Sequence, residues 1–185
     1  MSVARVALFV GLALLAGCAR EAPLRTVPSL DLARYAGDWY VIAHLPAKNE
    51  RNAYDAIEHY DVEGERIRIR YTFREGSHEG ERQELHMRGW VHDERTRAEW
   101  RVRPFWPLAL AYVVVALDPD YQTTVVAHPS RKYAWIMART PTLAPDALEP
   151  LVETLREQGF DTTRLRYVPQ RSPAVPDPQS TAYAE

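Results

Sequence analysis

The stretch Gly37-Asp38-Trp39-Tyr40-Val41-Ile42-Ala43 decides how the rest of the chain is interpreted. It opens the first long apolar run after the N-terminal leader, and its odd positions form one face of a strand with period two: Trp39, Val41, Ala43 and Leu45. Gly37 gives the backbone freedom to turn into that strand, and Trp39 can plug one end of a closed sheet. A sandwich strand with an aromatic core residue would show the same local pattern, so the stretches 118–121 and 133–139, placed where a barrel needs them, favour the barrel.

Residues 1–17 have the pattern of a signal peptide. Arg5 is the short positive region, and the apolar run that follows it, about ten residues long, is too short to span a membrane. The next residues, Leu15-Ala16-Gly17-Cys18, resemble the lipobox of bacterial lipoproteins, which implies cleavage before Cys18 and attachment of lipid to its sulfur and to the new amino end. Cys18 is the only cysteine, so no internal disulfide can form. Ordinary secretion with a free cysteine is the alternative.

The length of the remaining chain fits one domain with a sizeable core. We expect a lipidated cysteine and tether at 18–29, a folded domain at 30–170 and a disordered, proline-containing tail at 171–185. The formal net charge of −2 does not suggest nucleic-acid binding.

Segments of alternating character, separated by turn residues, are typical of an antiparallel all-β fold. In 66–74 one face is apolar and the other is rich in arginine, which predicts a strand buried on one side, whereas 108–117 is apolar throughout and predicts a strand covered on both faces. Eight strands in up-and-down order close into a barrel just wide enough for one small ligand. The predicted strands are 37–45, 54–62, 66–74, 85–91, 98–103, 108–117, 121–128 and 133–139.

Three helical or edge features complete the prediction. Asp31 caps a short helical turn over 31–35. An amphipathic helix carries Leu148, Leu151, Val152 and Leu155 at i, i+3, i+4 and i+7, ends at Gly159 and covers the outside of the barrel, with Pro150 either kinking it or starting it. Residues 165–168 can add a short ninth strand.

Three motifs together resemble the lipocalin family, and within it the bacterial outer-membrane lipocalins: 37–40, 117–121 and 135–139. The match covers about residues 30–170, and Pro150 and the longer loop 107–111 are departures that concern loop shape and the pocket mouth. The resemblance implies a calyx-shaped eight-stranded β-barrel with a C-terminal α-helix on its outside, and it places the Arg139 guanidinium over the Trp39 ring. The motif residues are Gly37, Trp39, Asp120, Tyr121 and Arg139.

The predicted ligand site is the inner face of this barrel, on the side that shares the phase of Trp39. Small residues leave room there and aromatic residues line the walls. Side chains that simply fill the barrel are the alternative, but an isolated carboxylate in a filled core is costly. We therefore expect an elongated monoacyl lipid with its tail inward. The site residues are Ala43, Ala56, Glu58, Tyr60, Ile69, Tyr71, Phe73, Leu85, Met87, Gly89 and Trp100.

The sequence offers little for catalysis or for a metal. The serine of Gly76-Ser77-His78-Glu79-Gly80 does not occupy the place it has in a nucleophile elbow, and His86 and His92 are about 20 Å apart on a strand, too far to share a metal. We therefore expect no catalytic residues, no metal and no cofactor. For an enzyme acting on a lipid inside the barrel, only Glu58 with Tyr60 or Tyr71 comes close to an acid–base pair.

The resemblance implies a lipoprotein that binds a fatty acid or lysophospholipid and serves envelope maintenance. An aspartate after the lipidated cysteine would argue for retention in the inner membrane, but Ala19 stands there, so we expect the outer membrane, with the protein on the periplasmic side. The arginines at 66, 68, 70 and 74 predict a solvated face that could also attract anionic head groups. A lipid-acting enzyme and a structural envelope lipoprotein with a filled barrel remain alternatives, and the sequence leaves monomer and homodimer open.

Overall fold

The computed structural model describes residues 22–171. The predicted signal peptide, Cys18 and the tail beyond Arg171 lie outside that range. The elements are α1 (Leu32–Tyr35), β1 (Gly37–Leu45), η1 (Lys48–Glu50), β2 (Ala53–Glu63), β3 (Arg66–Glu75), β4 (Arg82–Val91), β5 (Glu99–Arg103), β6 (Leu110–Leu117), β7 (Thr123–Ala127), β8 (Ala134–Ala138), α2 (Pro145–Glu157), η2 (Thr162–Arg164) and β9 (Arg166–Tyr167).

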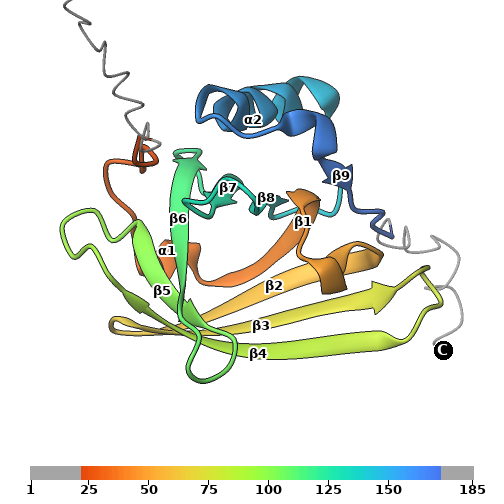
Figure 1. The fold of residues 1–185 in the computed structure, drawn as a ribbon, viewed down its shortest axis with the longest axis horizontal. Coiled ribbons are helices and arrows are strands. Elements are labelled where there is room, and N and C mark those ends of the chain that lie inside the picture. Colours follow the sequence, from red (N-terminus) through yellow and green to blue (C-terminus); the bar gives the residue numbers. More distant parts are fainter. Residues whose placement is uncertain (1–21, 172–185) are drawn as a thin grey trace, which may run out of the picture.

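Strands β1 to β8 form one closed antiparallel barrel (Figure 1). Each strand pairs with the next along the chain, and β1 pairs with both β8 and β2, which leaves no free edge between first and last strand. The short β9 pairs with β1, with Ala43 opposite Tyr167. The predicted fold class is therefore confirmed, including the ninth strand.

The alternation of β3 decides which face is inside. Ile67, Ile69, Tyr71 and Phe73 are each 5% exposed or less, while Arg66, Arg68 and Arg70 between them are exposed. These inward side chains join Trp39 and Val41 in one buried cluster that fills the closed part of the barrel. The arginines of β3 thus form a solvated outer face, as the sequence predicted.

A β-bulge in β1 overturns one prediction about the inner face. The pairing register with β8 shifts between Val41 and Ala43, because one extra residue is inserted there. After the bulge the alternation is reversed. Ala43 and Leu45 therefore do not share the face of Trp39 and Val41, but pack in a second cluster outside the barrel. The assignment of Ala43 to the ligand site is wrong for this reason.

Strand β6 serves two layers through the alternation of its side chains, and its bulge lies later, between Val114 and Ala116. Tyr112 and Val114 face the inner cluster, whereas Val113 and Val115 face the outer one, as expected for a strand covered on both sides. The strand begins at Leu110, two residues later than predicted.

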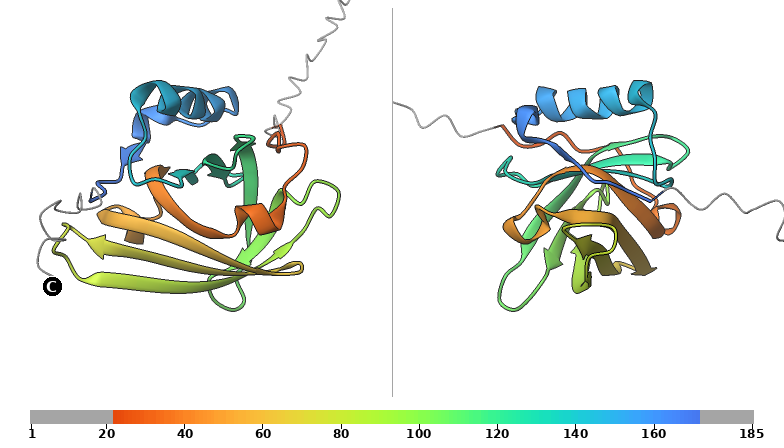
Figure 2. Two further views of the ribbon diagram at one scale, coloured as in Figure 1. Left: turned by 180° about the vertical axis from the view of Figure 1, so that it is seen from behind. Right: turned by 90° about the vertical axis from the view of Figure 1, so that its right-hand side faces the viewer.

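Helix α2 covers the outer face of β6, β7 and β8, as Figures 1 and 2 show. Val152 and Leu155 are its buried contacts with that face. The helix begins at Pro145, so of the two alternatives for Pro150 a helix start is wrong, and Pro150 lies inside the helix. Gly159, with φ of +84°, ends it as predicted: the amide of Phe160 donates to the carbonyl of Leu155, which is the Schellman arrangement.

Residues 22–30 are docked on the barrel and do not form a free tether. The amide of Val27 donates to the carbonyl of Val114, and Gln158 holds Arg25 through hydrogen bonds to both its amide and its carbonyl, each 2.8 Å long. Val27 and Leu30 are buried. The prediction of a tether over 18–29 is therefore wrong for residues 22–29.

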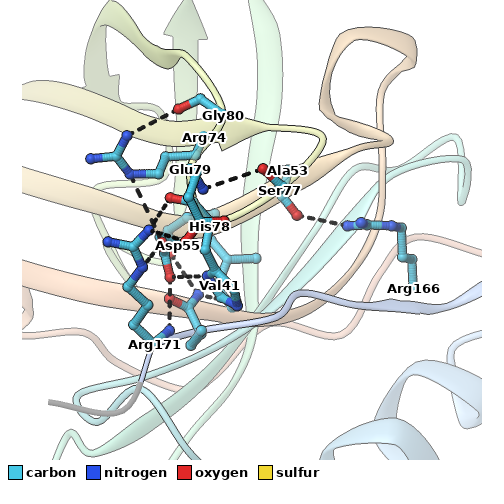
Figure 3. A network of polar contacts seen from close by, with 12 residues as sticks. Val41, Ala53, Asp55, Arg74, Ser77, His78, Glu79, Gly80, Arg166 and Arg171 are labelled. Atoms are coloured by element: carbon cyan, nitrogen blue, oxygen red, sulfur yellow. Dashed lines mark hydrogen bonds and ion pairs between the residues drawn. The ribbon is translucent and has the colours of Figure 1, made fainter. Parts of the chain in front are cut away.

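The C-terminal segment 168–171 is fastened to β2 around Asp55 (Figure 3). The Asp55 carboxylate accepts from the Arg171 amide at 2.7 Å and lies 3.0 Å from Nδ1 of His78, while its own amide donates to the carbonyl of Pro169. Gln170 donates to the carbonyls of Val41 and Ala56. Asp55 has φ of +48° at the bulge of β2, and the residues at this bulge make the contacts with segment 168–171.

Candidate functional site

A cavity of about 380 Å³ opens inside the barrel. Its mouth is formed by the loops after β1, β5 and β7, and its walls by the inner faces of β2 to β6 and β8. That volume lies within the usual range of small-molecule sites. The lining residues are Ala47, Glu50, Glu58, Ile69, Tyr71, Leu85, Met87, Val102, Pro104, Phe105, Leu108, Leu110, Ala111, Tyr112, His128, Tyr133 and Trp135.

Two larger hollows, of about 570 and 470 Å³, lie on the arginine-rich outer face of β3 and β4. Arg68 and Arg88 border both of them. We place the candidate site in the barrel cavity, because a ligand site typically combines mainly apolar walls with a few polar groups, as that cavity does.

The inner end of the cavity carries a buried polar chain that ends at Glu58. The Tyr60 hydroxyl donates to the Glu58 carboxylate, and it lies 2.5 Å from the Tyr112 hydroxyl, which in turn lies 3.2 Å from that of Tyr35. Burial raises the pKa of Glu58 to about 7, a rise that the hydrogen bond from Tyr60 partly offsets. Burial likewise raises the pKa of Tyr60 and Tyr112, so both phenols keep their protons.

A second carboxyl group, Glu50, reaches the cavity from the loop between β1 and β2. It accepts a hydrogen bond from the indole of Trp135 at 3.3 Å, and burial raises its pKa. His44 lies 3.8 Å from it, but burial lowers the histidine pKa to about 4, with Arg166 adding to the effect. The imidazole is therefore neutral at pH 7 and does not compensate the charge of Glu50.

Tyr71 is the third polar group of the inner cavity. It lies opposite Glu58 in the β2–β3 pairing. Its buried hydroxyl has no hydrogen-bond partner within residues 22–171, and neither ring nitrogen of His44 has one. An unpaired buried polar group costs about 1–3 kcal/mol, which a ligand or a water molecule at this end would relieve.

The structure brings five of the predicted ligand residues together at the cavity: Glu58, Ile69, Tyr71, Leu85 and Met87. The other inward residues lie in packed parts of the barrel. Tyr60 and Trp100 belong to the closed-end plug, where the Trp100 ring stacks on Tyr112 with centroids 4.8 Å apart. Phe73 stacks on Tyr71, and Ala56 is fully buried beside the bulge of β2.

Gly89 also faces a packed part of the barrel. A Cβ built on it would lie 3.5 Å from Val102 and 3.6 Å from Ile67, both buried side chains. Gly89 is therefore not among the residues that line the barrel cavity, and its role in leaving room for a ligand stays a prediction.

Sequence reasoning missed the part of the site that comes from loops and from β6 and β8. The alternation of polar and apolar residues cannot show which side chains face inward within a continuous apolar run, so Tyr112 was not predicted as a site residue. Glu50 lies in a turn, where strand alternation assigns no face. The aromatic residues of the loop after β5 were the signal that could have indicated the cavity mouth. Phe105 and Leu108 of this loop border the cavity, and Trp106 is 81% exposed beside them in the sequence.

The motif residues gather at the opposite, closed end. The Arg139 guanidinium donates to carbonyls of Arg34, Tyr35, Ala36 and Asp38, and its Nε donates to that of Tyr121. It thereby ties α1, the start of β1 and the β6–β7 loop together.

In that loop, Asp118, which lies two residues before the motif residue Asp120, makes the organising contacts. The Asp118 carboxylate accepts from the amides of Asp120, Gln122 and Thr123. Partial burial opposes ionisation, but these bonds lower the pKa of Asp118. Tyr121, with φ of +60°, accepts from the Asp31 amide through its hydroxyl.

Between Ala22 and Arg171, no group of three or more His, Cys, Asp or Glu side chains could hold a metal ion. Over the same range, no helix is long and apolar enough to cross a membrane.

The model of the lipocalin-like domain matches residues 30–170. The outer membrane lipoprotein Blc of Vibrio cholerae is 32% identical over 160 residues, covering 85% of this chain and 94% of that protein. Temperature-induced lipocalin-1 of Arabidopsis thaliana is 30% identical over 156 residues, covering 80% and 83%. Among solved structures, insecticyanin from the tobacco hornworm Manduca sexta matches with a TM-score of 0.60 at 18% identity, covering 82% of this chain and 92% of that one. Apocrustacyanin C2 gives a TM-score of 0.61 at 16% identity, with 81% and 91% covered.

Proposed function

Because the chain belongs to the lipocalin family, we propose that it is an outer-membrane lipoprotein that binds and carries a small monoacyl lipid in its barrel cavity. The observation that carries this proposal is the mainly apolar cavity of about 380 Å³, open at one end of a closed barrel. Relatives named outer membrane lipoprotein Blc, among them the Vibrio cholerae protein, support the place in the envelope. Cys18 would carry the anchor, and the role would be envelope maintenance.

The cavity is suited to a single acyl chain. Each buried methylene contributes about 0.8 kcal/mol, so about ten of them contribute roughly 8 kcal/mol. Such a free energy corresponds to a dissociation constant of about 1 μM, before the cost of ordering the chain weakens it. Fatty acids and lysophospholipids both provide such a chain.

The test is calorimetric titration of the purified protein with lysophospholipids of increasing chain length. Affinity should rise by about 0.8 kcal/mol, or roughly fourfold, for each methylene until the cavity is full. Met87→Trp should abolish binding, because Met87 lines the cavity. His86→Trp is the matched control, because His86 directly precedes Met87 on β4 and its side chain is 72% exposed on the outer face. Affinity that ignores chain length, or that survives Met87→Trp, would exclude the cavity as the binding site.

A lipid-acting enzyme is the second candidate, favoured by one observation. The hydrogen-bonded pair of Glu58 and Tyr60 contains a carboxyl group whose pKa burial raises to about 7, a value suited to acid–base catalysis. Incubation of the protein with monoacyl esters, followed by mass spectrometry of the products, separates the two candidates. The carrier returns its ligand unchanged.

A further inference from the structure

The ionisable groups of the cavity are unevenly distributed in the sign of their charge. Glu50 and Glu58 line it, but no lysine or arginine among residues 22–171 does. Glu58 lies at the inner end, because it accepts a hydrogen bond from Tyr60, which belongs to the buried cluster at the closed end of the barrel. The mouth is mixed, because Phe105 and Leu108 on the loop after β5 are apolar, whereas Glu50 and His128 come from the loops after β1 and β7. Glu58 is therefore the charged group that the inner end of a ligand meets.

The direction of the hydrogen bonds in this polar chain leaves Glu58 as an acceptor. Tyr60 has one hydroxyl proton and donates it to Glu58, so its oxygen accepts from Tyr112. Tyr112 has then used its own proton and accepts from Tyr35. Only one oxygen of the Glu58 carboxylate receives a hydrogen bond from the residues described, and the other is left without a donor.

A free carboxylate would therefore be poorly placed at the inner end. It would meet the Glu58 carboxylate and no lysine or arginine among the described lining residues, and like charges in a low-dielectric cavity repel strongly. A methyl end would leave the Glu58 oxygen and the Tyr71 hydroxyl unpaired. A hydroxyl or an ammonium group can donate to Glu58, and an ammonium group also balances its charge.

We propose that the cavity binds its lipid with a hydrogen-bond-donating end, a hydroxyl or a primary amine, turned inward to Glu58, and that it discriminates against a free carboxylate. This inference rests on the proposed lipid-carrier function. It reverses the tail-inward orientation expected from the sequence, because the apolar part of the ligand then contacts Phe105, Leu108 and Leu85 near the mouth.

The experiment compares 1-decanol, decylamine and decanoate, which share one chain length, by calorimetric titration of the unmodified protein at pH 8. Decanol and decylamine should each bind at least about tenfold more tightly than decanoate. Both can donate a hydrogen bond to the Glu58 carboxylate, which contributes about tenfold or more in affinity, whereas decanoate cannot donate one. In Glu58→Gln, decylamine should lose about tenfold and decanoate should gain, so that the preference closes. Glu84→Gln, on the outer face of β4, removes a carboxylate outside the cavity and should leave all three affinities unchanged.

The outcomes separate this inference from the function on which it rests. Decanoate that binds the unmodified protein as tightly as decanol and decylamine would overturn the inference while lipid binding stands. Failure of all three ligands, and of the lysophospholipid series, would overturn both. Because the comparison of head groups uses the unmodified protein, it remains decisive even if Glu58→Gln does not fold.

Discussion

The guanidinium carbon of Arg139 lies 3.9 Å from the ring centroid of Trp39. The stack that the family resemblance implied is thus present, and it closes the narrow end of the barrel. Gly37 takes part, because its φ is +96° and a Cβ added to it would lie 3.4 Å from the Arg139 guanidinium. The Trp39 indole is held in place by a hydrogen bond to the Tyr35 carbonyl. Residues that open β1 and follow β8 therefore form one contact unit.

Arg139→Ala should lower the melting temperature without changing ligand affinity. The lost stacking and carbonyl contacts amount to about 2 kcal/mol, which corresponds to roughly 4–8 °C in a domain of this size. Thermal unfolding followed by circular dichroism measures the change. Arg139→Lys keeps the charge but loses the planar guanidinium, so its melting temperature should lie between those of wild type and Arg139→Ala. An unaltered melting temperature in Arg139→Ala would contradict the role of this stack.

Asp55→Ala should loosen the C-terminal segment and destabilise the barrel by about 1–2 kcal/mol. Its carboxylate is only 18% exposed and binds both the Arg171 amide and the His78 ring (Figure 3). Asp55→Asn should cost less, since asparagine tolerates the positive φ and still accepts a hydrogen bond. Asp61→Asn, which removes an exposed partner of Arg68, should change stability by less than about 0.5 kcal/mol. Equal losses at positions 55 and 61 in urea unfolding would contradict a specific clamp.

The proposed lipid anchor at Cys18 predicts that Cys18→Ser releases the protein into the soluble fraction. The reason is the lipobox-like sequence before Cys18, because several acyl chains anchor a protein firmly whereas one binds only marginally. Cell fractionation with immunoblotting gives the result. Ala19→Asp provides the matched control, since it should keep the anchor but shift the protein to the inner membrane. Cys18→Ser protein that still sediments with membranes would refute this mode of attachment.

Sequence patterns predicted the strands well wherever the alternation of side chains was unbroken. In β3 the arginines identify the solvent-exposed face without ambiguity. The sequence pattern gave the wrong face at Ala43, because a bulge inserts one residue into β1 and exchanges the faces beyond it. No residue type marks that insertion. The cavity was predicted in part for a different reason. Glu58 and Met87 follow from strand phase, but Glu50 and Trp135 reach the cavity through loop geometry and a shifted register.

The buried carboxyl of Glu58 should make stability fall as the pH rises from about 4.5 to about 7. Burial raises its pKa to about 7, so in this window the folded protein binds more protons than the unfolded chain, and the full cost above pH 7 is about 3 kcal/mol. His44 acts in the opposite sense between pH 4 and 6.5, because burial lowers its pKa to about 4, while the raised pKa of Glu50 acts in the same sense as Glu58.

Subtracting the unfolding free energy of wild type from that of Glu58→Gln isolates the Glu58 contribution, because His44 and Glu50 are present in both proteins. The facing phenols of Tyr60, Tyr71 and Tyr112 do not titrate here, since burial raises their pKa. Urea unfolding between pH 4.5 and pH 8.5 should show the difference growing in favour of the variant by about 3 kcal/mol, most of it between about pH 5 and pH 7. Glu84→Gln, which removes an exposed carboxylate, should follow the wild-type slope. A difference that stays flat across this range would mean that Glu58 has the same pKa in the folded and in the unfolded protein, which would contradict the effect of burial.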